Sequence, residues 1–425
     1  MMFWKKSPSA VLATLLTIHL LAHIDRNMLL GFSPQIIKAL AINNAQYGFL
    51  VGAVWVLSFG VMAMLMGTLA DRFSRTRIIA AGVLIWSACT WASGHAQSFE
   101  QMAIARFFVA SGEAALVPAA VGLLSELFSE KRRGTAMGLF FMGIPLGIGC
   151  SFLLAGTFGA THGWRTTFYA LGVTGVAIAL PLALLKEERG QLAPQERGAP
   201  ALQQVLAVLS LVRGHRALRF TITGFVLTHI AFAGLSFTPL WLVNERGMDA
   251  AGIATRIGAL QLLFGTLGAL AGGVLSDRAA RKLPGGRATF MALLVVICAP
   301  FVIAYRLAPA GSPLFYIGMC VGFFLPLALY GPANAAITGM TPQKMRSTVS
   351  GFTMLCINVF AIAIGTVAVG AATDYLIANG TTAPLTRVLL TTDALAMASA
   401  LFFALAARAA CARPAIGMQP VQTTR

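Results

Sequence analysis

Four ionisable side chains lie inside apolar stretches of the sequence. Asp25 and Arg26 belong to an apolar run that begins near residue 9, and Arg106 and Glu113 lie seven residues apart in a later run. A charge near the centre of a lipid bilayer costs roughly 3 kcal/mol, so groups in such places usually serve function or pair with one another. We therefore treat these four residues as the candidate charge network of the protein.

Helical geometry predicts which of these side chains meet. With the first helix running outward and the fourth inward, Asp25 lies roughly 9 Å and Arg106 roughly 12 Å below the outer helix ends. Glu113 projects from the same face as Arg106, roughly 10 Å deeper. Arg106 is expected to pair with Asp25 or to share charge with Glu113, and a proton can neutralise one carboxylate instead. Glu113, flanked by Gly112 and Ala114, is the more desolvated carboxylate, so we expect it to carry the proton. The alternative is a permanent ion-pair cluster that holds the two helices together.

The composition indicates the elements that must hold these groups. Apolar residues make up 57% of the 425 residues and charged residues 11%, whereas soluble domains carry roughly 25% charged residues. Several stretches also exceed the roughly 18 apolar residues that mark a membrane-spanning helix. We predict an all-α membrane protein with twelve transmembrane helices at approximately residues 9–31, 46–70, 77–95, 98–124, 134–159, 165–185, 218–243, 252–276, 286–305, 312–338, 345–371 and 387–409.

The positive charge follows membrane topology. The net charge is +17, and 23 of the 31 Lys and Arg residues fall in alternate connections, with six in the others, Arg306 among them. By the positive-inside rule both termini are cytoplasmic, and no nucleic-acid partner is implied. The first apolar run is long and lacks a small-residue cleavage signature, so we expect it to be retained. The abundance of Ala, Gly and Arg favours a bacterial inner membrane.

The chain divides into two related halves. The polar, proline-containing break 186–217 separates an N-terminal half, 1–185, from a C-terminal half, 218–425. Within the break, residues 200–212 are expected to form a short helix on the membrane surface. Asp71 and Asp277 lie in similar loops 206 residues apart, and the same offset aligns His23 with His229. Two pseudo-symmetric six-helix halves are one of the repeat patterns of secondary transporters.

The repeated loops have a separate expected role. An acid at the end of one helix can accept hydrogen bonds from the positive N-terminus of a neighbouring helix, which locks one conformation and releases in the other. The alternative is a solvated charge run that only marks an inner loop. The predicted conformational latch comprises Gly67, Asp71, Arg72, Arg75, Asp277 and Arg278.

The repeat also separates the chemistry of the two halves. At the 206-residue offset the four charged residues align with Ala231, Phe232, Ser312 and Met319, so the C-terminal half has no charge at these positions. Its expected contribution is mostly apolar and neutral polar, which suits an amphipathic substrate whose polar head lies near Arg26 or Arg106. The two histidines can titrate near physiological pH, although a hydrogen-bonded structural role is the alternative. The candidate cavity residues are His23, His229, Gln261, Tyr330, Asn334 and Asn358.

These motifs resemble those of a known family. The loop from Gly67 to Arg75 resembles the signature loop of the major facilitator superfamily, with Ser74 where a glycine is usual. The segments 23–27 and 106–118 resemble helix 1 and helix 4 motifs of the spinster-type branch, and the organic-anion symporter branch shares an Asp-Arg pair in helix 1. The superfamily resemblance spans essentially the whole chain. It implies the major facilitator fold, and the spinster-type branch implies lysophospholipid or sphingosine phosphate substrates and proton coupling.

The sequence also lacks the motifs of other classes. There is no phosphate-binding GxxxxGK[ST] loop, no GxSxG, and the six cysteines show no metal-ligand spacing. We therefore expect neither an enzyme nor a bound cofactor or metal, with a transmembrane proton gradient as the energy source. The prediction is a monomeric, proton-coupled secondary transporter that works by alternating access on an amphipathic anionic or zwitterionic substrate such as a lysophospholipid, among membrane lipids. The alternatives are a proton-coupled symporter of small organic anions and a non-transporting membrane sensor.

Overall fold

The computed structural model describes residues 7–60, 62, 74–183 and 201–412, and its regular elements there are all helical. The N-terminal half contains α2 (Pro8–Gly31), α3 (Ser33–Leu40), α4 (Asn44–Gly48), η1 (Phe49–Ala53), α6 (Arg75–His95), α7 (Phe99–Glu113), α8 (Leu116–Leu127), α9 (Glu130–Phe141), α10 (Gly143–Gly156) and α11 (Phe158–Ala183). The remaining elements are α12 (Ala201–Gly214), α13 (Arg216–Ser236), α14 (Thr238–Asn244), α15 (Ala250–Leu260), η2 (Gln261–Gly265), α16 (Thr266–Lys282), α17 (Arg287–Leu307), α18 (Pro313–Gly339), η3 (Gln343–Met345), α19 (Arg346–Cys356), η4 (Ile357–Ala363), α20 (Ile364–Ala378), α21 (Pro384–Met397) and α22 (Ser399–Cys411).

The helices are those of a multi-pass membrane protein. Within the described ranges, ten helices are long and apolar enough to cross a membrane. The expected second helix begins with α4 and η1 and then runs into residues that the structure does not describe. The expected sixth helix is α11, 26 residues long and kinked at Gly163, whose φ of 78° favours glycine. The predicted all-α membrane fold is confirmed, and these elements are consistent with twelve helices.

The predicted end of the first membrane helix at residue 31 is confirmed, because α2 ends at Gly31. A short helix that was not predicted, α3, follows Phe32 and ends at Leu40. Pro34 lies in the first turn of α3, where its missing N–H costs no helical hydrogen bond. Hydropathy did not predict α3 because residues 33–40 include Gln35 and Lys38. The short helix expected at 200–212 is present as α12, which buries Val208 and exposes other apolar side chains.

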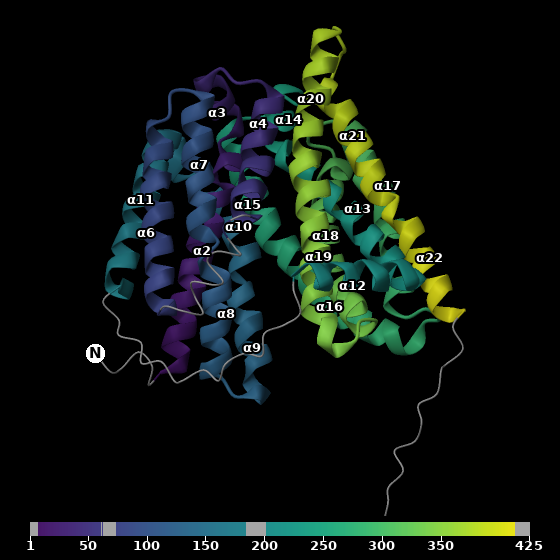
Figure 1. Ribbon diagram of the computed structural model, residues 1–425. Coiled ribbons are helices and arrows are strands. Elements are labelled where there is room, and N and C mark those ends of the chain that lie inside the picture. The colour runs from purple at the N-terminus through teal and green to yellow at the C-terminus, as the bar shows by residue number, and fades with distance from the viewer. Residues whose placement is uncertain (1–6, 61, 63–73, 184–200, 413–425) are drawn as a thin grey trace, which may run out of the picture.

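The two halves stand side by side, and their helices carry the chain ends to one common end of the molecule (Figure 1). We name the end that holds Pro8 and Cys411 the inner end, following the predicted orientation, and the opposite end the outer end. The halves meet along two seams. The first packs α4 and η1 against α20 and η4, and the second packs α10 against α15 and η2. A smaller contact joins α3 to α14.

Glycine allows close approach of the backbones in the first seam. A Cβ at Gly48 would collide with the carbonyl oxygen of Thr366, and one at Gly370 would collide with that of Asn44. The Thr366 hydroxyl also donates to the carbonyl oxygen of Gly48 at 2.8 Å. Small residues and cross-helix hydrogen bonds are the usual means by which helices pack in lipid, where burial of apolar surface gives no driving force.

Asp374 closes the outer end of this seam. Its carboxylate accepts from the backbone N–H of Asn44 at 3.1 Å, from the Asn44 side chain at 2.7 Å and from the backbone N–H of Ala45 at 2.8 Å. A carboxylate at a helix N-terminus satisfies free N–H groups and opposes the positive end of the helix dipole. Asp374 therefore makes, between the halves and at the outer end, the type of contact that was expected of Asp71 at the inner end.

Replacement of Asp374 should loosen the outer end. Loss of a helix cap costs about 1–2 kcal/mol, so Asp374→Ala should shift the equilibrium between closed and open outer ends by roughly tenfold. Pulsed electron paramagnetic resonance between spin labels at Ala39 of α3 and Asn244 of α14 would report the separation of the halves. The expected result is a larger population of long distances.

Asp249→Ala is the matched control. Asp249 caps α15 by accepting from the backbone N–H of Gly252 at 2.7 Å, and both residues belong to the C-terminal half. The control removes a cap without removing a contact between the halves. Identical distance distributions for the two variants would show that Asp374 does not hold the outer end closed.

Candidate functional site

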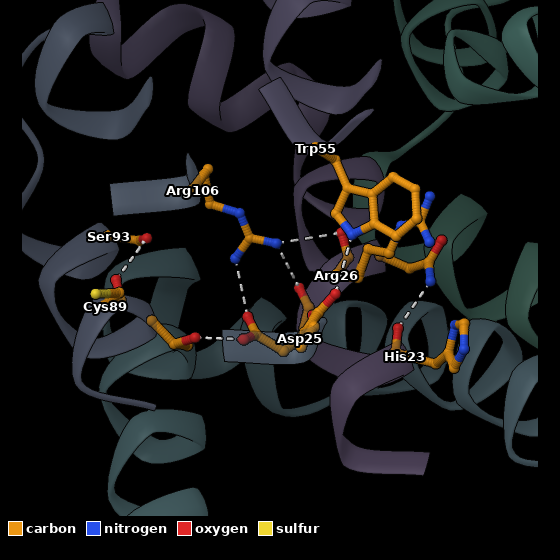
Figure 2. A network of polar contacts seen from close by, with 10 residues as sticks. His23, Asp25, Arg26, Trp55, Cys89, Ser93 and Arg106 are labelled. Atoms are coloured by element: carbon orange, nitrogen blue, oxygen red, sulfur yellow. Dashed lines mark hydrogen bonds and ion pairs between the residues drawn. The ribbon is translucent and has the colours of Figure 1, made fainter. Parts of the chain in front are cut away.

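A buried ion pair joins the first and fourth membrane helices. Arg106 Nη1 lies 2.9 Å from Asp25 Oδ1, and both side chains are buried. Nη2 of the same guanidinium donates to the carbonyl oxygens of Asp25 at 3.3 Å and Arg26 at 3.5 Å. Figure 2 shows the guanidinium of Arg106 directed at Asp25 and the backbone of α2. Of the two pairings expected for Arg106, the structure shows the one with Asp25.

The carboxylate of Asp25 has partners on both oxygens. Oδ1 receives Arg106, and Oδ2 receives the hydroxyl of Thr90, which lies on α6. Three helices, α2, α6 and α7, thus share one carboxylate that is only 1% exposed. A buried charge with complete hydrogen bonding is far less costly than an unpaired one. The geometry is that of a stable structural ion pair.

Glu113 has different surroundings. Its Oε2 accepts from the indole N–H of Trp55 at 3.0 Å, while its buried Oε1 has no hydrogen-bond partner among the described residues. The guanidinium carbon of Arg26 lies 3.4 Å from the centre of the Trp55 ring, which is a close cation–π contact (Figure 2). Trp55 therefore contacts both Arg26 of α2 and the under-bonded carboxyl of α7.

A small pocket opens beside this group. It brings two guanidinium groups together with aliphatic side chains and one indole, so it offers positive charge at one part of its wall and apolar surface at another. The residues that line it are Arg26, Leu29, Leu50, Val51, Trp55 and Arg106.

His23 does not join the charge network. Its ring lies edge-on to that of His19, with the centroids 4.8 Å apart, and its backbone packs on Gly147 of α10. His19, which the sequence analysis did not select, stacks on Phe140 and has Nδ1 2.9 Å from the Phe140 carbonyl oxygen. The two histidines therefore pack between the first and fifth membrane helices.

The other cavity candidates fall into two groups. His229 and Tyr330, from α13 and α18, have ring centroids 5.9 Å apart, and the Tyr330 side chain is 39% exposed. Asn334 donates to the Tyr330 carbonyl oxygen on its own helix at 2.9 Å. Gln261 and Asn358 lie instead in the π-helical turns η2 and η4, at the two seams between the halves. The structure thus gathers three candidates along one face and places two at the seams.

The predicted latch is described only in part. Gly67, Asp71 and Arg72 lie outside the described residues, and of Arg75 only the backbone, at the start of α6, is described. Ser74, which stands where a glycine is usual, caps α6 by accepting from the backbone N–H of Arg77 at 3.4 Å.

The C-terminal counterparts of the latch lie on the surface. Asp277 pairs with Arg287 at 2.7 Å, an exposed contact between α16 and α17 of the same half, and Arg278 is exposed. This pair does not connect the two halves, so a latch role for Asp277 stays a prediction.

One expectation was wrong. The C-terminal half was expected to hold mostly apolar and neutral polar groups, with Arg306 in an outer connection. Arg306 is instead 1% exposed inside α17, and its Nε lies 2.8 Å from Oδ2 of Asp393 on α21. The 206-residue offset did not predict this pair, because Arg306 and Asp393 do not align with Asp25 and Arg106. The usable signal was Asp393 itself, an ionisable residue inside the predicted span 387–409.

Trp55 and Thr90 were not among the residues predicted from the sequence. Both donate hydrogen bonds to the buried carboxylates, but aromatic and hydroxyl residues are common in membrane helices. A single occurrence of either type therefore gives no signal in one sequence. Contact between helices that are distant in the chain is what reveals them.

Two helical halves, the first of which holds a buried charge network, define a polytopic membrane protein. The model of the Major Facilitator Superfamily matches residues 15–366, and the chain belongs to this superfamily. It is therefore a membrane transporter, not an enzyme, with a small molecule or a lipid as its substrate.

Individual relatives agree with this assignment. The chain is 26% identical to an MFS-type efflux pump of Mycolicibacterium smegmatis over 86% of this chain and 85% of that protein. It is 26% identical to the protein spinster of Drosophila melanogaster over 67% of this chain but 48% of that protein. A crystal structure of a bacterial homologue of the human lysosomal transporter spinster, inward-facing and unoccupied, aligns with a TM-score of 0.82 at 23% identity, covering 95% of this chain and 97% of that one. Within the superfamily the chain is spinster-like.

Loss of Asp25 should destabilise the protein. Asp25→Ala leaves the guanidinium of Arg106 buried without its counter-charge, a change that typically costs about 3–5 kcal/mol. The apparent unfolding temperature of the purified protein in detergent should fall. Glu100→Gln is the control, because it alters an exposed carboxylate at the start of the same helix as Arg106 and should leave the temperature nearly unchanged. Equal temperatures for the two variants would refute a stabilising ion pair.

Proposed function

We propose that this protein is a proton-coupled transporter that works by alternating access on an amphipathic anionic or zwitterionic substrate such as a lysophospholipid. The observation that carries the proposal is the pairing of an under-bonded buried carboxyl, Glu113, with a pocket that contains both guanidinium groups and apolar side chains. The energy source in this proposal is the transmembrane proton gradient.

The contrast between the two carboxylates supports Glu113 as the proton carrier. Asp25 has a cation and a hydroxyl as partners, so a proton would displace a contact that already exists. Glu113 has one neutral N–H donor, and its Oε1 has no partner among the described residues. A carboxyl in such a place can gain or lose a proton without breaking a hydrogen-bonded ion pair, which is the property that a coupling group needs.

Trp55 provides the connection to the substrate. When Glu113 is protonated, Arg26 keeps its place on the indole and is available to an anionic group in the pocket. When Glu113 releases its proton, Arg26, held on the same indole, can neutralise the carboxylate instead. The ionised Glu113 and the anionic substrate thus compete for Arg26. Binding of a proton to Glu113 therefore raises the affinity for the substrate, and binding of the substrate raises the affinity for the proton.

The pocket wall supports an amphipathic substrate. Arg26 and Arg106 suit a phosphate or carboxylate, since guanidinium groups bind such planar or tetrahedral anions with paired hydrogen bonds. Leu29, Leu50 and Val51 complete the wall and suit a hydrocarbon chain.

A small organic anion is the second candidate substrate, favoured by the two guanidinium groups alone, without the apolar wall. The proposal further places the protein in a bacterial inner membrane as a monomer, with both termini in the cytoplasm. A non-transporting sensor would bind the same ligands but would not move them.

Uptake into proteoliposomes tests the proposal. A labelled lysophospholipid and a labelled aromatic carboxylate would be supplied side by side under an imposed pH gradient. We expect gradient-dependent movement of the lysophospholipid, and its loss by tenfold or more in Glu113→Gln. Exchange of labelled for unlabelled substrate without a gradient should persist in the variant, because the substrate pocket remains.

Glu100→Gln serves as the control for this assay, since Glu100 is exposed at the outer end of the same helix. Movement of the carboxylate alone would replace the lipid substrate by an organic anion. Gradient-driven uptake in Glu113→Gln equal to that of the control would remove Glu113 as the proton carrier. Binding without movement of either compound would indicate a sensor.

A further inference from the structure

The C-terminal half holds a second buried charge site that the proposed mechanism does not use. Arg306 and Asp393 lie on α17 and α21, the ninth and twelfth predicted membrane helices, and are 1% and 3% exposed. Their contact is a single hydrogen bond of 2.8 Å from Nε to Oδ2. The guanidinium also lies over Tyr305 and Trp241, 4.5 Å and 4.8 Å from the ring centres.

This pair is less completely bonded than the one in the N-terminal half. Nη1 of Arg306 is buried and has no hydrogen-bond partner among the described residues. Asp393 receives its one protein hydrogen bond, within the same ranges, from Arg306. Neither Arg306 nor Arg106 binds both oxygens of its carboxylate. Asp25 has a second donor in Thr90, however, and Asp393 has none among the described residues. Asp25, with two donors, is the contrasting case.

A pocket lies directly beside the pair. It has room for about one water molecule, and polar atoms of the pair form part of its wall. A water in this space would satisfy Nη1 and deliver a proton to the carboxylate. The lining residues are Ala231, Leu235, Val302, Tyr305, Arg306, Gly322, Leu325, Pro326, Asp393 and Met397.

Among the residues that line the pocket, Asp393 is the one with a carboxylate. Helix α17 contributes Tyr305 and Arg306, α21 contributes Asp393, and the lining residues of α13 and α18 have no ionisable side chain. His229 of α13 is bonded to the backbone of its own helix, with Nδ1 2.8 Å from the carbonyl oxygen of Phe225.

Two more charged groups lie beyond the wall. Glu245 accepts from the backbone N–H groups of Leu385 and Thr386 at 2.6 Å and 2.9 Å, which caps α21. Arg246 lies over Trp241 and donates to the carbonyl oxygen of Arg306. Both therefore have their own partners, and neither replaces Asp393 as the acceptor of a proton from the pocket.

We infer that Asp393 is a second proton-binding site of the transporter, at which a water in the pocket delivers a proton to the carboxylate. The proton passes from a hydronium ion to a carboxylate oxygen, which leaves a neutral carboxyl and a water, and no other bond breaks. Arg306 retains its stacking on Trp241 and Tyr305 and a hydrogen bond to the neutral carboxyl. The inference rests on the proposed proton-coupled transport and adds a second exchangeable proton to it, one in each half.

Infrared difference spectroscopy tests the protonation directly and does not require transport. A pH step applied to the purified protein should produce carbonyl bands of protonated carboxyl groups. We expect Asp393→Asn to remove one band and Glu113→Gln to remove a different one. Glu100→Gln should change neither. Retention of every carboxyl band in Asp393→Asn would overturn the inference, whether or not Glu113 carries a proton.

Proton stoichiometry separates this role from a structural one. The double variant Arg306→Met with Asp393→Leu removes both charges, and replacement of a buried ion pair by apolar residues usually preserves folding. From reversal potentials in proteoliposomes, we expect one proton fewer per substrate in this variant than in the wild type. An unchanged ratio would assign the pair a structural role only. Absence of gradient-driven uptake in the wild type would refute the proposed coupling while the infrared result still decides the protonation of Asp393.

Discussion

The ion pair between Arg106 and Asp25 requires the helices of the N-terminal half to pack so that both buried charges have partners. Both charges lie in an apolar region, so each must find its partners from neighbouring helices rather than from water. The first, third and fourth membrane helices meet at the carboxylate of Asp25, because Arg106 donates to one oxygen and Thr90 to the other. Glu113 has the indole N–H of Trp55 as a donor, and its Oε1 has no partner among the described residues. In the proposed mechanism, this difference makes Glu113, and not Asp25, the group that exchanges a proton.

The same physical rule explains what the sequence predicted well. Long apolar runs identify most helices because lipid excludes charge. The same exclusion makes Asp25, Arg26, Arg106 and Glu113 stand out in the sequence. Helix α3 was not predicted because its polar residues resemble those of a loop. Asp393 escaped for another reason: the two halves were compared position by position, and its pair with Arg306 has no counterpart at the offset. Trp55 and Asp374 act through contacts with distant segments, which one sequence does not record.

The two seams and the charge sites occupy different parts of the molecule. In the first seam, glycine residues and Thr366 make neutral contacts between the halves. Asp374 adds one carboxylate, which caps α4 at the outer end. The buried ion pairs instead lie within single halves. A change in the relative tilt of the halves therefore separates neither of these ion pairs.

The π-helical turns at η1, η2 and η4 have a mechanical consequence. Each accommodates one more residue per turn than an α-helix, and each lies where one half touches the other. If such a turn tightens to an ordinary α-helical turn, the segment beyond it must rotate by about 100° and advance by about 1.5 Å. Gln261 and Asn358 lie within two of these turns, so a local change of helix type would re-aim their amides without a hinge. A change between π-helical and α-helical winding would thus rotate one part of these helices relative to the other.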